Sequence, residues 1–531
     1  MRRLRERIHC IRHRIRRVRP PPFGHACCVL FIISRLLSAQ IEHIQTAARF
    51  LNDGQMAEAE AEARQALAGR NTRPLALAML GTIRLQAGKY DESTNFLIQA
   101  LALNPNLVGA RTTLGDAYLL QGKPQLAERT FRQALKLDPS NFNARFDLVK
   151  VEASLHNFQE SLEVARPILP RLLKSEESIQ VLATDYGALG KKQELRGLIE
   201  HWQHLPSPND ESSLAFGELL NLYGMKDEGR NILDVEETRI AAHPSAALAL
   251  RLGNDYLSLG VLTRAERNSQ LALSLAPDCS ACYQTLAQIA ERQDSSEKAL
   301  AYLMAARKQD PENPEILFDF GKLCLKRNLV DDALPALTKA VALKPDEDSY
   351  VYVLGSANVA SGNLPNAAKL FGRLLEKHPR DAILNYAIGA VYYLEGKYTE
   401  AETSLKQSLA IEPDQIAASY YLALTYDAIG DDERAIPIFR NLVSVHPQHA
   451  PSYVKLGGVL VRRHQYDEAR QDLERGVSLD PESVEAHYQL GVLLRRLGKT
   501  EESENQFAQS RKLESEQREQ KDLHLRLLLP D

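Results

Sequence analysis

The sequence predicts an all-α protein, a solenoid of stacked helix-turn-helix units. A pattern of small residues, turn residues and prolines recurs every 34 residues along most of the 531-residue chain. Alanine and leucine are abundant and aromatic residues make up only 6% of the chain, a composition typical of closely packed helices. Runs of β-branched residues bounded by turn residues, which would indicate strands, do not occur.

Residues 108–141 show the unit most clearly. Its first helix is expected to end near Leu120, because Gly122 can adopt the left-handed conformation and Pro124 suits the first turn of a following helix. Pro139 then ends the second helix. The second helix carries an apolar stripe made of Ala127, Phe131, Ala134 and Leu135. A unit this small cannot bury its apolar face alone, so it needs neighbours of the same shape.

The eighth place of each unit holds a small residue, which lets the two helices of the unit approach closely. The residues at this place are Ala47, Gly81, Gly115, Gly217, Gly253, Ala287, Gly321, Gly355, Gly389, Ala423, Gly457 and Gly491. A second alanine, early in the second helix, serves the same approach from the other side. A terminating proline completes each of seven successive units and separates it from the next, at Pro277, Pro311, Pro345, Pro379, Pro413, Pro447 and Pro481.

This pattern resembles the tetratricopeptide repeat (TPR) family, through LGDAYLLQGKPQLAERTFRQALKLDP at 114–139 and AIGAVYYLEGKYTEAETSLKQSLAIEP at 387–413. The resemblance covers about residues 40–517 and about fourteen units. It implies a right-handed superhelix whose first helices line the concave face. The predicted units start near residues 40, 74, 108, 142, 176, 210, 246, 280, 314, 348, 382, 416, 450 and 484.

We expect two regular arrays, 40–141 and 246–517, separated by a divergent section at 142–245. Pro167 and Pro170 fall inside a second helix of that section, where each removes a backbone donor. The section is either a hinged, irregular region or a diverged part of one unbroken solenoid. Residues 518–531 are rich in leucine, and we interpret them as a capping helix or tail that covers the last unit.

Residues 1–39 form a basic leader. They hold ten arginines and one glutamate, a net charge of +9, so the rest of the chain carries −13 of the total of −4. The acidic body argues against nucleic acid as a partner. The arginines, the apolar run at 27–33 and Ala39 resemble an export signal, with an uncleaved anchor or a leader of neither kind as the alternatives. An export signal would favour a periplasmic or secreted protein, and otherwise the protein would be cytoplasmic.

Cys279 and Cys282 form a C-x-x-C at the start of a first helix, where a thiol pKa is lowered. The pair is either a redox pair or two small residues at the joint between units. No second C-x-x-C exists to complete a zinc site, and no metal or cofactor is expected. The motifs of nucleophilic, metallo- and phosphate-binding enzymes are absent, and we expect no enzyme activity.

The best candidate for a functional surface follows the first helices of the later units. Aromatic residues occupy the fifth place, which faces the concave groove in the family, and the alternative is that they only pack the helices together. These fifth-place aromatics are Phe318, Tyr352, Tyr386, Tyr420 and Tyr488, and neighbouring groove places hold Asn254, Lys322 and Tyr393. Rigid, half-polar aromatics are good anchors for a peptide.

The sequence therefore predicts a non-catalytic scaffold that binds protein or peptide partners in the concave groove. One alternative is an exported or envelope-tethered assembly or secretion factor. Another is an accessory subunit of an enzyme supplied by a different chain. A membrane contact is expected only if the leader is an uncleaved anchor.

Overall fold

The computed structural model describes residues 40–206 and 208–527, with side chains up to residue 517. This part of the chain is helical throughout and contains no strand, which confirms the all-α prediction. The chain divides into two compact units, unit 1 (Met1–His243) and unit 2 (Pro244–Asp531). Among the described helices, none is both long and apolar enough to cross a membrane. The predicted export signal lies outside the described residues.

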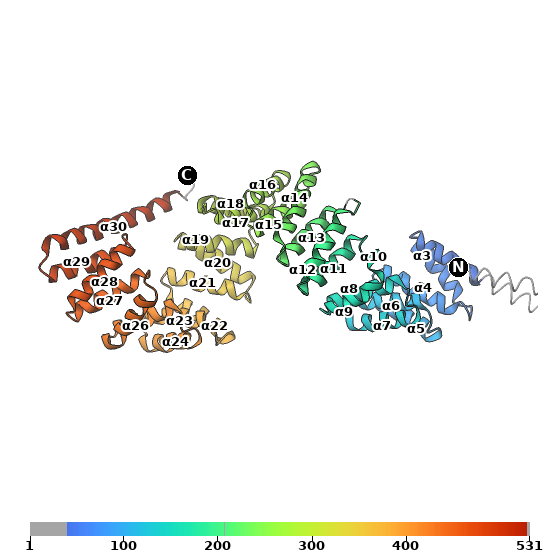
Figure 1. The fold of residues 1–531 in the computed structure, drawn as a ribbon, viewed down its shortest axis with the longest axis horizontal. Helices are drawn as coiled ribbons and strands as arrows, with labels where there is room; N and C mark the ends of the chain where they lie inside the picture. Colours follow the sequence, from blue (N-terminus) through green and yellow to red (C-terminus); the bar gives the residue numbers. More distant parts are fainter. Residues whose placement is uncertain (1–39, 207, 528–531) are drawn as a thin grey trace, which may run out of the picture. The chain divides into compact units, whose positions relative to one another are not determined.

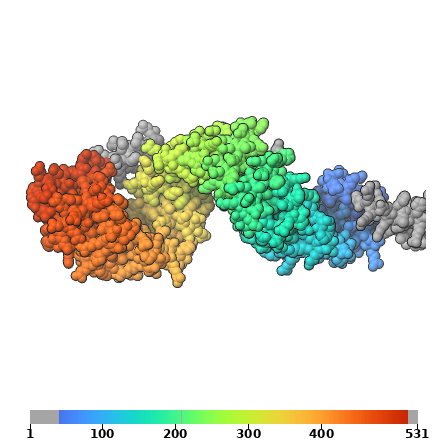
Figure 2. All heavy atoms as spheres, in the orientation of Figure 1, coloured from blue at the N-terminus to red at the C-terminus, as the bar shows by residue number. Residues whose placement is uncertain are grey.

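Unit 1 is a series of helix pairs, and each first helix from α4 onward begins within one residue of its predicted start (Figure 1). The helices pack side by side into a continuous surface (Figure 2). The first helices are residues 40–52, α4 (Arg73–Gln86), α6 (Val108–Leu120), α8 (Phe142–Ser154), α11 (Glu176–Ala188) and α13 (Asp210–Leu222). The second helices are α3 (Met56–Ala66), α5 (Tyr90–Leu103), α7 (Pro124–Leu137), α9 (Phe158–Ala165), α12 (Lys192–Gln203) and α14 (Lys226–Ala242).

Unit 2 continues the same alternation, and its helices follow one another in chain order (Figure 1). The first helices are α15 (Ala246–Ser258), α17 (Ser280–Arg292), α19 (Pro314–Lys326), α21 (Asp348–Ala360), α23 (Ala382–Leu394), α25 (Ile416–Ala428), α27 (Ala450–Arg462) and α29 (Val484–Arg496). The second helices are α16 (Leu262–Leu275), α18 (Ser296–Gln309), α20 (Val330–Leu343), α22 (Leu364–Lys377), α24 (Tyr398–Ile411), α26 (Asp432–Val445), α28 (Tyr466–Leu479) and α30 (Thr500–Leu527).

The C-terminal helical segment expected after residue 517 is the distal part of α30. This helix runs without a break from Thr500 to Leu527 and is twice as long as the 14-residue α28 before it. The segment is thus a continuation of the last second helix and not a separate element. Residues 528–531 lie outside the described part of the chain.

The eighth-place glycines bring the two helices of a unit into close contact, as predicted. A Cβ added to Gly115 on α6 would lie 2.4 Å from Cε1 of Phe131 on α7. The same construction at Gly355 on α21 meets Phe371 on α22 at 2.6 Å. Because Phe131 is fully buried, its ring has no room to withdraw.

The turn between the two helices of a unit requires one residue with positive φ. Glycine fills this place in ten units, from Gly54 to Gly498, with φ between 68° and 79°. Four units hold a different residue in the same left-handed conformation, which costs more for any residue with a side chain. These residues are His156, Asp294, Asn328 and His464, with φ between 55° and 61°.

The second helix that contains Pro167 and Pro170 is interrupted. Helix α9 ends at Ala165, and a 3₁₀ turn over Arg166–Ile168 and the short α10 (Leu169–Leu172) follow it. A cavity of about 180 Å³ opens beside the break and is lined by Arg166, Tyr186 and Leu182, among others. Proline removes the backbone donor and clashes with the preceding turn, which explains the interruption.

Candidate functional site

The first helices form the inner side of unit 2. Those of successive units pack against each other, in the pairs α15–α17, α19–α21, α23–α25 and α27–α29. Within the described part of unit 2, no two successive second helices make as extensive a contact as α23–α25 or α27–α29. A stack of helix pairs curves toward the side on which neighbouring helices approach each other more closely. The side formed by the first helices is therefore the concave one. We call the surface formed by α15, α17, α19, α21, α23, α25, α27 and α29 the first-helix face.

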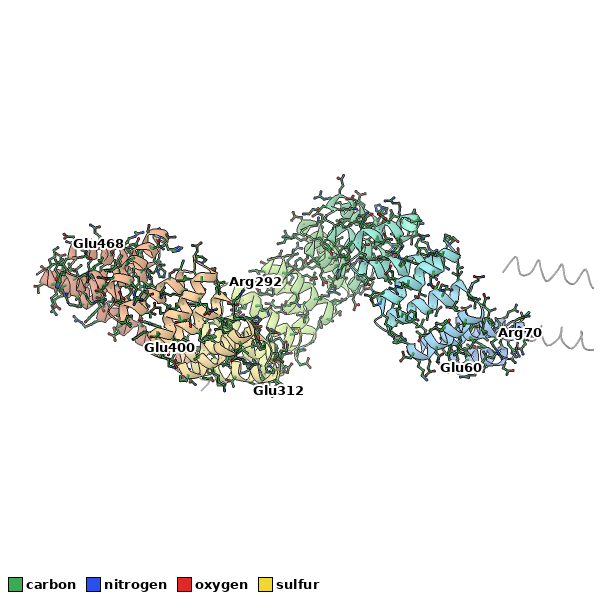
Figure 3. All side chains as sticks on the ribbon, turned by 90° about the horizontal axis from the view of Figure 1, so that it is seen from below. Glu60, Arg70, Arg292, Glu312, Glu400 and Glu468 are labelled. Carbon is green, nitrogen blue, oxygen red and sulfur yellow. A yellow bond between two sulfur atoms is a disulfide. The ribbon has the colours of Figure 1, made fainter. Side chains whose placement is uncertain are left out.

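The second helices form the outer side, and ion pairs link them. Arg440 on α26 pairs with Glu468 on α28 at 2.9 Å, and Arg434 on α26 with Glu402 on α24 at 3.1 Å. Figure 3 labels Glu468 on α28 and Glu400 on α24. The second helices of neighbouring units are thus joined by ion pairs on this side.

The fifth-place aromatics both pack the helices and remain accessible. Tyr352 contacts Phe371 with ring centroids 5.3 Å apart, and Tyr488 contacts Phe507 at 5.6 Å. Phe371 and Phe507 belong to the second helix of the same unit, so the packing role considered above is present. Yet Tyr352 is only half-buried and Tyr488 is 52% exposed. Each ring thus anchors on its own helix pair and leaves an edge on the first-helix face.

Several tyrosines on α23, α24 and α25 lie together. Tyr421 is at the centre, with ring centroids 5.6 Å from Tyr393, 5.8 Å from Tyr386 and 6.1 Å from Tyr420. The ring of Tyr398, the first residue of α24, is 6.0 Å from that of Tyr393. We call these five residues the tyrosine cluster. Sequence reasoning named three of them and missed Tyr421 and Tyr398, because it examined only the usual groove places and Tyr421 occupies the sixth.

The hydroxyl groups of four cluster tyrosines are available to a partner. Within the described residues, those of Tyr386, Tyr393, Tyr420 and Tyr421 form no hydrogen bond, and none is a buried, unsatisfied group. By contrast, the hydroxyl of Tyr426, also on α25, donates to Glu402 at 2.9 Å. A hydroxyl that forms no hydrogen bond within the chain and is in contact with solvent can form one with a ligand.

Partial burial affects the titration of three of these tyrosines. It raises the pKa of Tyr386, Tyr393 and Tyr420 above the usual value of a phenol. The carboxylate of Glu485 on α29 also raises the pKa of Tyr420 and of Tyr393.

The surroundings of the cluster on α21 and α23 carry no charge. On α23, Tyr386 and Tyr393 share a helical stripe with Ile383 and Leu394, which are 52% and 46% exposed. The matching stripe of α21 is also uncharged, and it consists of Ser349, Tyr352, Ser356, Val359 and Ala360. Large exposed apolar side chains beside accessible aromatics are the usual composition of a binding surface.

Ion pairs border this uncharged area on both sides. On α19, Lys322 lies 3.8 Å from Asp319 and 5.7 Å from the ring centroid of Phe318. On the other side, Arg462 pairs with Asp427 and with Asp432, and Lys455 with Glu485. Each of these charged side chains thus has an opposite charge beside it on the protein.

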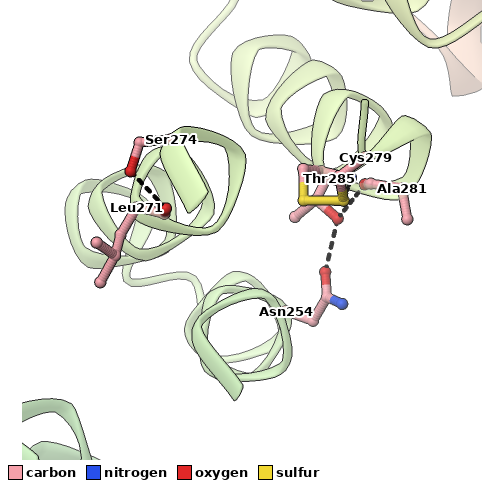
Figure 4. The surroundings of a disulfide bond; sticks show 7 residues. Asn254, Leu271, Ser274, Cys279, Ala281 and Thr285 are labelled. Atoms are coloured by element: carbon pink, nitrogen blue, oxygen red, sulfur yellow. Dashed lines mark hydrogen bonds between the residues drawn. A yellow bond between two sulfur atoms is a disulfide. The ribbon is translucent and has the colours of Figure 1, made fainter. Parts of the chain in front are cut away.

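The predicted groove residues do not all meet. Tyr386, Tyr393 and Tyr420 lie together, whereas Phe318 stacks on Tyr350 at 4.3 Å in an earlier part of the face. Asn254 is on α15, where its side-chain oxygen accepts a hydrogen bond from Thr285 at 2.9 Å (Figure 4). Asn254 therefore links two helices, and the site is centred on α23 and α25.

The two cysteines of the C-x-x-C form a disulfide in the structure, with Cα atoms 5.3 Å apart (Figure 4). The sulfur of Cys279 accepts a hydrogen bond from the backbone N–H of Cys282 at the start of α17. The redox role stays a prediction. The remaining cysteine of the described chain, Cys324, is a buried thiol, and burial raises its pKa to about 12. The described residues contain no group of side chains that could hold a metal ion.

Unit 1 has an aromatic at the same fifth place that sequence reasoning did not single out. Phe146 on α8 stacks on Phe142 at 6.0 Å, and the ammonium group of Lys150 lies 4.8 Å from its centroid. Lys150 also pairs with Asp147 and Glu177. This part of unit 1 is thus charged, in contrast to the tyrosine cluster.

Family models described as tetratricopeptide repeats match more than half of the chain. The matches lie at residues 75–107, 112–171, 292–356, 352–416 and 392–457, and a model described as a TPR repeat matches 457–498.

Curated relatives share short parts of their length with this chain. The human "Protein O-mannosyl-transferase TMTC3" is 24% identical over 45% of this chain and 28% of its own length. The Drosophila melanogaster "BBSome complex member BBS4 homolog" is 24% identical over 37% of this chain and 41% of its own length. The chain thus spans less than half of either relative. Among solved structures, "APC/C hetero-tetramer Cut9-Hcn1" aligns with 87% of this chain and 98% of its own chain, at 15% identity and a TM-score of 0.41.

Proposed function

Because the chain belongs to the tetratricopeptide repeat family, we propose that it is a non-catalytic scaffold that binds protein or peptide partners on the first-helix face of unit 2. The tyrosine cluster carries this proposal. Its rings are held by contacts with one another, so little side-chain freedom is lost when a partner binds. Its hydroxyls have no partner within the described chain.

The uncharged stripe of α23 adds apolar area to this surface. Ile383 and Leu394 stand on the same helix as Tyr386 and Tyr393, and each exposes about half of its side chain. Burying such side chains against a partner contributes roughly 25 cal/mol per Å² of apolar surface, before the costs of association. The Drosophila relative is named as a member of a protein complex, which agrees with a role in binding proteins.

The test is affinity capture with the full chain from an extract of the source cells. We expect Ile383→Arg combined with Leu394→Glu to remove the captured proteins, because both substitutions place a charge on the uncharged stripe. Both positions are exposed, so the fold should tolerate the change. Ile411→Arg is the matched control, since Ile411 is 41% exposed at the end of the second helix α24. An unchanged set of captured proteins in the double variant would refute the proposal.

A second candidate role is that of an accessory subunit for an enzyme carried by another chain. The similarity to a human O-mannosyl-transferase over 28% of its length motivates it. Co-purification of a transferase activity with the full chain, lost in the Ile383→Arg and Leu394→Glu variant, would support this role. A captured set without any enzyme would exclude it.

Export of the protein is a separate proposal that rests on the leader alone. The ten arginines and the short apolar run of residues 1–39 support it. N-terminal sequencing of the protein purified from cell fractions decides between the alternatives. A mature protein that begins near Gln40 in the exported fraction is expected, and an intact leader on cytoplasmic protein would contradict it.

A further inference from the structure

We propose that the tyrosine cluster and the adjoining stripe of α21 bind a proline-rich segment in the polyproline II conformation. This inference rests on the proposed function and gives the chemistry of the partner. Three properties of the surface point to such a ligand: the spacing of the fifth-place tyrosines, the hydroxyl groups they present and the absence of charge between α21 and α23.

The tyrosines are spaced at one per first helix. Tyr352, Tyr386 and Tyr420 occupy the same place on the three successive first helices α21, α23 and α25. A polyproline II helix has three residues per turn and rises about 3.1 Å per residue, so it presents every third residue on the same side. A ligand with proline at every third position therefore offers a row of rings to this row of tyrosines.

The hydroxyl groups suit a ligand that offers acceptors and few donors. The hydroxyls of Tyr386, Tyr393, Tyr420 and Tyr421 make no hydrogen bond within the described chain. Burial raises the pKa of the first three, so these hydroxyls remain protonated and able to donate. A proline-rich segment has carbonyl groups that no internal hydrogen bond occupies, and proline has no backbone N–H. Donors on the surface then face acceptors on the ligand.

The lack of charge on this surface disfavours peptide segments that carry charged residues. Neither the stripe of α21 nor that of α23 holds a charged side chain. The charges at the borders, such as Lys322 and Arg462, already have partners on the protein. A charged residue of a ligand placed against the stripes of α21 and α23 would lose its hydration without gaining a partner there. A preformed polyproline II helix also loses little conformational entropy when it docks on aromatic side chains.

The test uses the full chain and three uncharged, fluorescently labelled peptides of equal length in an anisotropy titration. One peptide has proline at every third position, the second has the same composition in shuffled order, and the third is an alanine-based helix. We expect the first to bind most tightly. Tyr393→Phe with Tyr420→Phe should weaken its binding roughly tenfold, the loss expected for two ordinary hydrogen bonds. Ile411→Arg should leave its affinity unchanged.

The outcomes distinguish a failure of this inference from a failure of the proposed function. If the shuffled or the helical peptide binds as well as the first peptide, or if the Phe variant binds the first peptide with unchanged affinity, the inference is wrong. If no peptide binds while Ile383→Arg with Leu394→Glu still abolishes partner capture, the polyproline inference fails and the proposed function stands. If that double variant captures the same proteins as the unmodified chain, the proposed function fails and the inference fails with it.

Discussion

The ring of Tyr393 on α23 meets the ring of Tyr421 on α25 edge-on, with centroids 5.6 Å apart and planes at 83°. This contact joins the first helices of two successive units. Edge-to-face pairs of this kind contribute about 0.5–1.5 kcal/mol beyond the area that they bury. The same contact fixes both rings on the first-helix face, so it links the packing of unit 2 to the proposed binding surface.

We expect a double-mutant cycle between Tyr393→Ala and Tyr421→Ala to show a coupling energy of about 0.5–1.5 kcal/mol. The measurement is chemical denaturation of the full chain. The loss of helix signal in the transition of unit 2 monitors it. Tyr393→Ala with Tyr302→Ala is the control, since Tyr302 lies on the second helix α18 of a distant pair. Additive effects in the first cycle would show that the ring contact contributes nothing.

Gly115→Ala should destabilise unit 1 by about 1–3 kcal/mol, the usual cost of overpacking a core. The new methyl would lie 2.4 Å from the buried ring of Phe131. Gly109→Ala on the same helix α6 is the control, because nothing lies within 4 Å of the added atom. For Gly109→Ala we expect the free energy of unfolding to increase by up to about 1 kcal/mol, from helix propensity alone. Thermal denaturation of both variants checks the prediction, which a change of the same sign at both positions would contradict.

Replacing His156 with glycine should stabilise unit 1 by about 1 kcal/mol. His156 is exposed and has φ 61° at the turn between α8 and α9, the place that glycine fills in ten other units. Removing its side chain relieves the strain and loses an edge contact of its ring with that of Phe158, whose centroid is 5.6 Å away. Gly122→Ala, at φ 70°, is the reverse change and should destabilise. Urea denaturation measures both, and a less stable His156→Gly protein would refute the explanation.

Asp185 should make the stability of unit 1 depend on pH. The carboxyl group is fully buried, its Oδ2 lies 2.6 Å from Oγ of Ser161, and its Oδ1 has no partner. Burial raises its pKa to about 7, whereas an unfolded aspartate titrates near pH 3.9. The folded state therefore holds a proton that the unfolded state has lost between these values. Stability decreases as the pH rises through this range.

Asp185→Asn tests this dependence, because the amide cannot ionise but still accepts a hydrogen bond from Ser161. We expect the decrease in the free energy of unfolding between pH 5 and about 8 to be smaller in the variant than in the natural protein. Part of the decrease should remain, since burial also raises the pKa of Asp116 and of Glu236 to about 7. Identical pH profiles for the two proteins would show that Asp185 does not titrate in this range.

The fold could be predicted from the sequence because packing residues define the repeat. Gly115 and Phe131, or Gly355 and Phe371, face each other at close distance, and such pairs can recur only if the helices recur in the same arrangement. The turn glycines were predictable for the same reason. His156 and Asn328 were not, since only the backbone shows that these residues adopt the glycine conformation.

The site was harder to predict, because it depends on contacts between units. The fifth place pointed to Tyr386 and Tyr420, but the central position of Tyr421 follows from the packing of α25 against α23. The C-x-x-C spacing allows a disulfide without requiring one. The bond between Cys279 and Cys282 is therefore a feature that the structure shows and the sequence alone does not predict.

Photo-crosslinking from position 393 tests the central claim most directly. A benzophenone side chain in place of Tyr393 keeps an aromatic ring on the first-helix face of the full chain. The matched control places the same group at Lys369, an exposed residue of the second helix α22. We predict that irradiation in source cells links partners to the protein from position 393 and not from position 369. Crosslinks from position 369 with none from position 393 would contradict the assignment of the binding surface.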